Sequence, residues 1–260
     1  MSGKLINYEK KDGVAIVTLN NPKNLNSLDD ALIAQFKEVI NDVQTDDKIG
    51  AVILTGTGRA FCAGGDINVM ADGFTVVSGY KHMTAFHKWT SEFAKIKKPI
   101  IGAINGLAVG GGFSLALLCD VLLASTDAKF SLAFVNVALV PDLGIAHYLA
   151  RSLGKHKLKE LSFTGRMIGV EEAVQLGFVM KAVQPQKLME EAFELAKQLA
   201  DGPRVMLSYT KKLIDDAYDL DHDTVLEIEA RTQTECFLTQ DHKNAARAFF
   251  NKEKAVFTGE

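Results

Sequence analysis

Short apolar runs alternate with amphipathic stretches along the first 140 residues of the chain. Val14–Leu19 and Ala51–Thr55 consist mainly of β-branched and aliphatic residues, and the second run is apolar almost throughout, as buried parallel strands are. Between them, Asp30–Gln44 carries apolar side chains at helical spacing. This alternation predicts an α/β fold with a parallel core and helices packed outside it.

The same alternation continues beyond the second strand. We expect four more elements, in the order helix, strand, short apolar helix and strand: Ser78–Lys97, Pro99–Ile104, Phe113–Leu118 and Val121–Ala124.

The pattern becomes mostly helical after about residue 143. Gly177 is placed to close a helix over Val170–Leu176, and Pro185 is placed to open a long helix that ends at Gly202-Pro203. Three more helices are expected before the end of the chain: Arg204–Tyr218, Thr224–Leu238 and His242–Asn251. We therefore predict a core over residues 1–200 and a helical C-terminal region over residues 201–260 that serves as a lid or an oligomer surface.

Composition and charge exclude several classes of function. The 29 basic and 32 acidic residues give a net charge of −3, which argues against nucleic acid or an anionic membrane as the main partner. Cys62, Cys119 and Cys236 show no CxxC spacing and the histidines form no ligand set, so we expect neither disulfides nor a metal site. The N-terminus lacks the apolar run of a signal peptide, and no apolar stretch approaches the roughly 20 residues that span a bilayer. We expect a cytoplasmic protein.

Two glycine-rich turns follow expected strands. The first is Arg59–Ile67, and the second, Asn105–Phe113, opens the short apolar helix. Glycine lets the backbone approach a ligand closely, and free N–H groups at a helix start suit a negative oxygen. Either turn alone is more often a simple tight turn, and a dinucleotide fingerprint fails because Leu115 stands three residues after Gly112.

Together, the two turns resemble the crotonase (enoyl-CoA hydratase/isomerase) superfamily. The matching segments follow one another along nearly the whole chain: Asn21-Pro22, Asn26-Ser27-Leu28, Ala60–Ile67, Gly106–Asp120, Pro141–Gly144 and Glu172–Val179. The resemblance implies a crotonase-like spiral of ββα turns followed by a helical C-terminal region. It also implies trimers, often paired into hexamers, in which Lys254 and Phe257 reach a neighbouring CoA.

The resemblance further implies an acyl-CoA thioester as substrate, with no cofactor besides the CoA that the substrate carries. The N–H groups of Gly65 and Gly111 would polarise the thioester carbonyl as an oxyanion hole. Ala63, Asp66 and Ile67 would lie along the CoA and contact it through their backbone.

Hydratases of this family carry two glutamates, and this chain has Ser114 and Phe134 at those positions. Adding water to an unsaturated thioester requires one group to activate water and another to handle its proton. A serine and a phenylalanine do not supply that pair, so the sequence argues against hydration.

Asp142 stands where isomerases of the family place an acidic residue. One carboxylate is enough to move a double bond, because it removes a proton from carbon 2 and returns it at carbon 4. A dry pocket beside Phe134 would raise the pKa of Asp142 toward the working range. As an alternative, Pro-Asp is common turn chemistry.

We therefore predict an enoyl-CoA isomerase of the 3-enoyl to 2-enoyl type. Two alternatives remain: a hydratase or other crotonase activity with an atypical base, and a catalytically silent acyl-CoA-binding member. We expect Asp66 and Asp120 to be structural, as a helix cap and a hydrogen-bond acceptor. The family's paired glycines after Pro-Asp are reduced to Gly144 here, so the acyl specificity of the family is not transferred.

Overall fold

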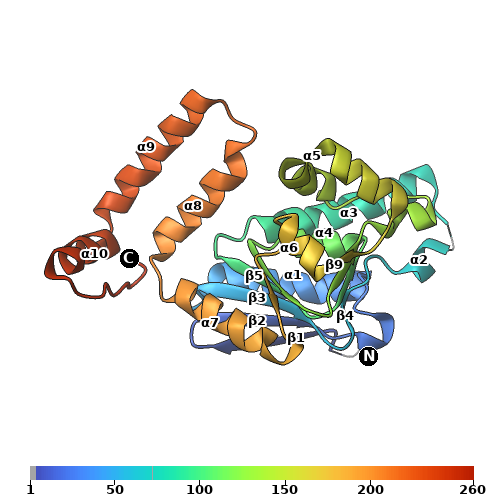
Figure 1. The fold of residues 1–260 in the computed structure, drawn as a ribbon, viewed down its shortest axis with the longest axis horizontal. Coiled ribbons are helices and arrows are strands. Elements are labelled where there is room, and N and C mark those ends of the chain that lie inside the picture. Colours follow the sequence, from blue (N-terminus) through green and yellow to red (C-terminus); the bar gives the residue numbers. More distant parts are fainter. Residues whose placement is uncertain (1–3, 72) are drawn as a thin grey trace.

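The structure is a computed structural model that describes residues 4–71 and 73–260 (Figure 1). Its larger sheet has six strands, in spatial order β1 (Ile6–Lys11), β2 (Val14–Leu19), β3 (Ala51–Gly56), β5 (Ile100–Ile104), β7 (Val121–Ser125) and β10 (Lys181–Val183). Only β1 runs antiparallel to its neighbour in this sheet. The smaller sheet has the order β4 (Ala60–Cys62), β6 (Leu107–Val109), β8 (Lys129–Ser131) and β9 (Ile168–Gly169).

Consecutive strands pass from the larger sheet to the smaller one, and a helix then returns the chain. β3 and β4 precede α2 (Ile67–Ala71) and α3 (Val76–Ala94), and β5 and β6 precede α4 (Gly111–Leu117). β7 and β8 precede the 3₁₀ turn η2 (Ala133–Val137) and α5 (Ile145–Thr164). This repetition is the spiral of ββα turns that the resemblance implies, and the α/β fold class predicted from the sequence is confirmed.

The larger sheet is covered on both faces. On one face, α1 (Asp30–Thr45) and α3 bury an aromatic group in which Phe36 meets Trp89 edge to face at 5.3 Å. On the other face, α7 (Leu188–Ala200) packs its alanine stripe against the sheet (Figure 1). Small side chains at every fourth position let the helix approach closely, and a Cβ added to Gly50 would lie 2.7 Å from Ala200 Cα.

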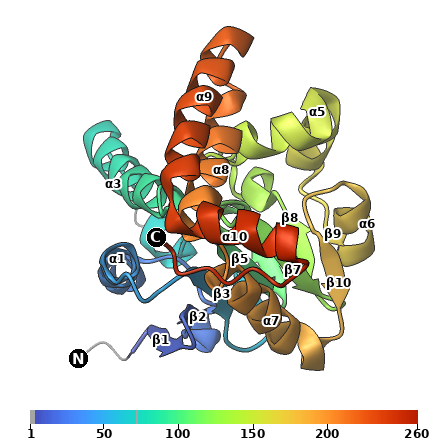
Figure 2. The ribbon, with the colours of Figure 1, turned by 90° about the vertical axis from the view of Figure 1, so that its left-hand side faces the viewer.

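The helices α8 (Arg204–Ala217), α9 (His222–Leu238) and α10 (Gln240–Asn251) project from the core as an arm (Figures 1 and 2). No residue of α8 or α9, which are described throughout, is buried. One tie to the core is an ion pair in which Lys211 Nζ lies 2.9 Å from Asp120 Oδ2. Asp120 also accepts a hydrogen bond from Ile100 N at 2.7 Å, which is the structural role expected for it.

The sequence missed several elements. β4, β6 and β8 are three residues long, too short to show an alternating pattern. α5 is interrupted at Gly154, where φ is 74°, so its apolar stripe changes phase. Pro185 opens a 3₁₀ turn (Pro185–Lys187) rather than the long helix itself, which begins at Leu188.

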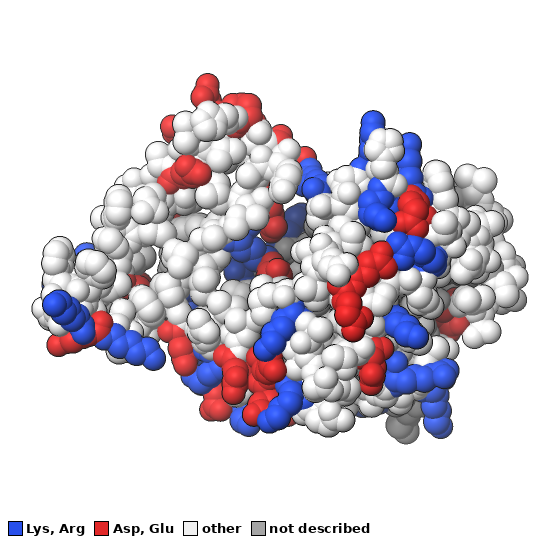
Figure 3. Space-filling model, viewed as in Figure 1, with Lys and Arg blue, Asp and Glu red and all other residues white. Residues whose placement is uncertain are grey.

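On the face drawn in Figure 3, basic and acidic side chains are interspersed over the core, whereas the arm is mostly uncharged, with acidic side chains toward its upper end. Within the described part of the chain, every helix is too short or too polar to cross a bilayer.

Candidate active site

The first glycine turn is held by the buried side chain of Asn26. Its Oδ1 accepts from Asn21 N at 2.8 Å, and its Nδ2 donates to the carbonyl of Ala60 at 2.8 Å. Two residues on, Leu28 N donates to the carbonyl of Gly64 at 2.7 Å, in an isolated parallel bridge that joins Leu28 to Gly65. The motif around Asn26 therefore fixes the backbone that presents Gly65.

The second glycine turn leads from β6 into α4 and lies directly against the first. A Cβ placed on Gly112 would lie 2.0 Å from the carbonyl oxygen of Cys62. A Cβ placed on Gly64, whose φ is +89°, would lie 3.0 Å from Gly111 N. Side chains at these positions would push the turns apart, so the glycines are what allows the two backbones to meet.

The amides of Gly65 and Gly111 are the two predicted oxyanion donors. No hydrogen bond found among the described residues uses either N–H as its donor. By contrast, Ala63 N donates to the carbonyl of Leu25 at 3.0 Å and Asp66 N to that of Leu28 at 3.2 Å. Gly65 is partly exposed and borders a small hollow of about 20 Å³, which is lined also by apolar and acidic residues: Leu28, Phe86, Asp29, Asp30 and Asp66.

Asp66 and Ile67, predicted to lie along CoA, follow that hollow. Asp66 Oδ1 accepts from Asn68 N at 2.9 Å, which caps the start of α2 as expected, and its Oδ2 accepts from Asn24 at 3.0 Å. The side chain of Ile67 is 62% exposed, so an apolar surface stands open next to Gly65.

Asp142 lies in a turn with a costly backbone conformation. The next residue, Leu143, has φ of 51°, and Gly144 has φ of 82°. Leucine rarely adopts this left-handed region, and strain of this kind gathers at functional sites. The side chain of Leu143 is buried against Gly111, since a Cβ placed on Gly111 would lie 3.3 Å from Leu143 Cδ1. The turn thus stands beside Gly111.

The carboxylate of Asp142 is half-buried, and its Oδ1 is shielded from solvent without a hydrogen-bond partner in the structure. Burial raises the pKa of Asp142 to about 6, and the nearby charge of His87 on α3 partly opposes that rise in pKa. A carboxyl group that titrates near neutral pH and has a free oxygen can both accept and return a proton.

Ser114 and Phe134 are the residues that the resemblance places at the positions of the hydratase carboxylates. Ser114 is fully buried, and its Oγ donates to the backbone carbonyl of Asp142 at 3.0 Å. Phe134 is buried in the same apolar cluster as Leu143, and its ring lies 3.9 Å from a Cβ placed on Gly110. Neither side chain can activate a water molecule.

The link from Ser114 to Asp142 and the seat of Leu143 on Gly111 were not predicted from the sequence. Both join residues that are about 30 positions apart, and no local pattern signals them. His87 is exposed on α3, and its charge acts on Asp142.

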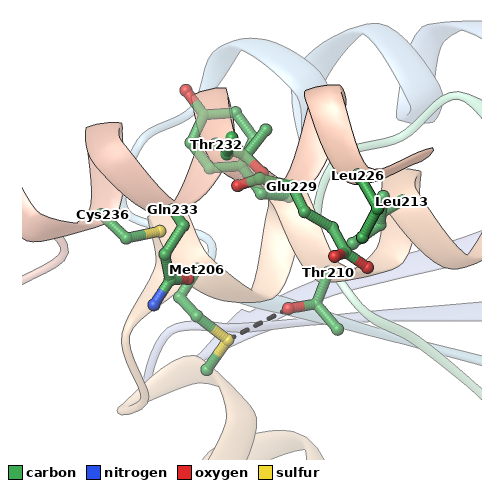
Figure 4. Close-up of a pocket in the computed structure, with 10 residues that line it drawn as sticks. Met206, Thr210, Leu213, Leu226, Glu229, Thr232, Gln233 and Cys236 are labelled. Atoms are coloured by element: carbon green, nitrogen blue, oxygen red, sulfur yellow. Dashed lines mark hydrogen bonds between the residues drawn. The ribbon is translucent and has the colours of Figure 1, made fainter. Parts of the chain in front are cut away.

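A larger cavity, about 530 Å³ in volume, lies away from the glycine turns, between α8 and α9 (Figure 4). Its walls combine apolar and polar side chains, including Met206, Leu213, Leu226, Glu229 and Cys236. Across the described ranges, no three His, Cys, Asp or Glu side chains are grouped to hold a metal ion.

Comparison with known proteins agrees with this geometry. The family profile described as enoyl-CoA hydratase/isomerase matches residues 9–260. The chain is 36% identical over 247 residues to a short-chain-enoyl-CoA hydratase of Clostridium acetobutylicum, covering 95% of this chain and 94% of that one. It is 35% identical over 250 residues to a 1,2-epoxyphenylacetyl-CoA isomerase of Escherichia coli, covering 95% of each. A crystal structure of an enoyl-CoA hydratase subunit from Geobacillus kaustophilus superposes with a TM-score of 0.94 at 33% identity, covering 98% of each chain.

Proposed function

The chain belongs to the enoyl-CoA hydratase/isomerase family, and from this premise we propose that it is an enoyl-CoA isomerase that converts 3-enoyl-CoA to 2-enoyl-CoA. The observation that carries the proposal is the half-buried carboxylate of Asp142, whose shielded oxygen has no partner. The next residue, Leu143, packs against Gly111, one of the two glycines whose amides are unused among the described residues. Most of the similar proteins bear hydratase names, so the proposal depends on the residues at positions 114, 134 and 142.

In the proposed reaction, the ionised Asp142 removes a proton from carbon 2 of the 3-enoyl thioester. The electron pair of that C–H bond becomes a dienolate, and its negative oxygen accepts hydrogen bonds from the Gly65 and Gly111 amides. Donors of this kind stabilise a transition state by about 2.7–4 kcal/mol each. The carboxylic acid then returns the proton to carbon 4, and the double bond comes to rest between carbons 2 and 3.

The raised pKa of Asp142 fits this proton shuttle, because the same group serves as base in the first step and as acid in the second. The half-buried turn also limits the water that could compete for the dienolate. CoA enters and leaves with the acyl group, and the proposed reaction needs no other cofactor. We place the CoA along Ala63, Asp66 and Ile67, beside the first glycine turn.

Product analysis tests the proposal. The protein is incubated separately with a 3-enoyl-CoA and a 2-enoyl-CoA, and the products are separated by chromatography. We expect the conjugated thioester from the first substrate and no 3-hydroxyacyl-CoA from the second. Hydration of the second substrate without isomerisation of the first would instead favour a hydratase with an atypical base. Acyl-CoA binding without any turnover would indicate a silent member of the family.

We also propose that residues 201–260 form the contact between copies in a homotrimer or a pair of trimers. The arm leaves large apolar side chains in solvent, among them Leu238 at 71%, Phe249 at 81% and Phe250 at 83% exposure. Exposed apolar groups on a projecting arm indicate a protein partner. Light scattering coupled to size-exclusion chromatography tests this proposal, and a monomer at micromolar concentration would contradict it.

A further inference from the structure

We propose that Ser114 is a positioning residue that fastens the backbone of Asp142 to α4, the helix that begins with Gly111. The inference rests on the proposed role of Asp142 as the base. It assigns a purpose to the serine that stands in place of a hydratase carboxylate.

The carboxylate of Asp142 has no anchor at its buried oxygen. Oδ1 lacks a hydrogen-bond partner, so no neighbour fixes the carboxylate through that atom. Burial raises the pKa of this carboxyl group, and the backbone hydrogen bond that partly lowers it comes from residue 142 itself, so the position of the side chain follows the backbone of residue 142. Any group that fixes this backbone also fixes the base.

Two hydrogen bonds reach the carbonyl oxygen of Asp142. One comes from Ile145 N at 3.1 Å, which belongs to the same turn and moves with it. The other comes from Ser114 Oγ at 3.0 Å, which belongs to α4. Of these two bonds, the serine bond alone joins the turn to the element that carries Gly111.

The turn needs such a tie because of its strained backbone. Leu143 holds a left-handed φ of 51°. A strained conformation persists only when its surroundings over-determine it. The buried Leu143 side chain, seated against Gly111, and the Ser114 hydroxyl supply two of those constraints from α4.

Ser114 is well placed for this task. It is fully buried, so water does not compete for its hydroxyl, and its other acceptor, the carbonyl of Gly110, is farther away at 3.4 Å. Gly111 and Ser114 lie one helical turn apart on α4. The helix therefore sets the spacing between the oxyanion amide and the base, and a misplacement of about 1 Å at a reacting group can cost about 100-fold in rate.

The test compares Ser114→Ala with Ser131→Ala. Ser131 is also fully buried, and its Oγ donates to the carbonyl of Gly165 at 2.8 Å, so the control loses the same kind of bond elsewhere. We expect kcat to fall roughly 10- to 100-fold in Ser114→Ala with KM nearly unchanged. Ser131→Ala should keep the wild-type kcat. Ser114→Cys, which retains a weak donor of similar size, should fall between Ser114→Ala and the wild type.

A second measurement does not depend on turnover. The Asp142 carboxyl is titrated by ¹³C NMR in the wild type and in both alanine variants. A loosened turn lets water reach the carboxylate, so its pKa should fall in Ser114→Ala and stay unchanged in Ser131→Ala. His87 on α3, whose charge acts on Asp142, is the same in all three proteins.

An unchanged kcat and an unchanged Asp142 titration in Ser114→Ala would overturn the inference. Equal losses of kcat in both variants would reduce Ser114 to a packing residue. If the wild type fails to isomerise, the proposed function fails, and the NMR titration alone then decides whether Ser114 positions Asp142.

Discussion

Replacing Asp142 by asparagine should remove activity and stabilise the protein at neutral pH. The carboxylate is held ionised in a half-buried turn, and asparagine keeps nearly the same shape without the charge. A functional group placed at a cost in stability commonly behaves in this way. Turnover should fall by roughly 10²- to 10⁴-fold, as expected for the loss of a general base. The variant should still bind an acyl-CoA, and a binding titration measures this.

The size of the stabilisation follows from the pKa of Asp142, which burial raises from 3.8 to about 6. Each pKa unit corresponds to about 1.4 kcal/mol, so ionisation of Asp142 lowers the free energy of unfolding by up to about 3 kcal/mol. Because the carboxylate is partly exposed, solvent screening reduces this value to about 2 kcal/mol. Because the native pKa is the higher one, the native state keeps a proton that the unfolded chain loses in this range. The free energy of unfolding of the wild type therefore falls as pH rises through the window between these two pKa values.

The assay is thermal unfolding of both proteins at pH 4 and pH 7, at one protein concentration. The advantage of Asp142→Asn should be small at pH 4 and reach about 2–3 kcal/mol at pH 7, or roughly 4–10 °C in Tm. Asp127→Asn, at an exposed position, is the control and should show no such growth with pH. If Asp142→Asn stabilises the protein equally at both pH values, burial does not oppose the ionisation of Asp142, and the reasoning is refuted. Retained turnover would remove it from the role of base.

Three further predictions concern the same site. The kcat of isomerisation should drop below about pH 6, where Asp142 takes up a proton; a rate that is flat from pH 5 to 8 would contradict this. Leu143→Gly should relieve the left-handed strain and open space over Gly111. The ratio of kcat/KM for bulky acyl groups to kcat/KM for short ones should therefore rise by roughly 10-fold or more. If this ratio is unchanged across an acyl-CoA series, Leu143 does not determine acyl specificity. Gly112→Ala should lower the free energy of unfolding by about 3 kcal/mol or more, because its Cβ would lie 2.0 Å from the Cys62 carbonyl. Gly177 has φ of +83°, but a Cβ placed there would lie within 4 Å of no described residue other than its chain neighbours, so Gly177→Ala should cost only about 1 kcal/mol in the same unfolding assay.

The elements with a strong local pattern were predicted well from the sequence. The β2 strand has the expected bounds, and α1 ends one residue beyond the expected end. The three helices of the arm begin and end within two residues of their expected bounds. In these segments, buried side chains recur with the period of the helix or strand, so the spacing of apolar residues in the sequence predicts the element.

The glycine turns were also visible in the sequence, because a close approach of two backbones leaves a run of glycines. What the sequence did not contain is how those turns meet the turn that carries Asp142. Leu28, Gly64, Gly111 and Asp142 come from four separate parts of the chain, and only the packing of the two sheets brings their surroundings together.

The residue types at positions 114, 134 and 142 could therefore be identified from the sequence, but the contacts that these residues make could not be predicted from it. Only the tertiary structure shows that Ser114 donates a hydrogen bond to the Asp142 carbonyl. It alone also shows that Leu143 adopts a left-handed φ and packs against Gly111. Local periodicity reports which side of an element is buried. It does not report which distant residue fills the space beside it, and the burial that raises the pKa of Asp142 arises from those distant contacts.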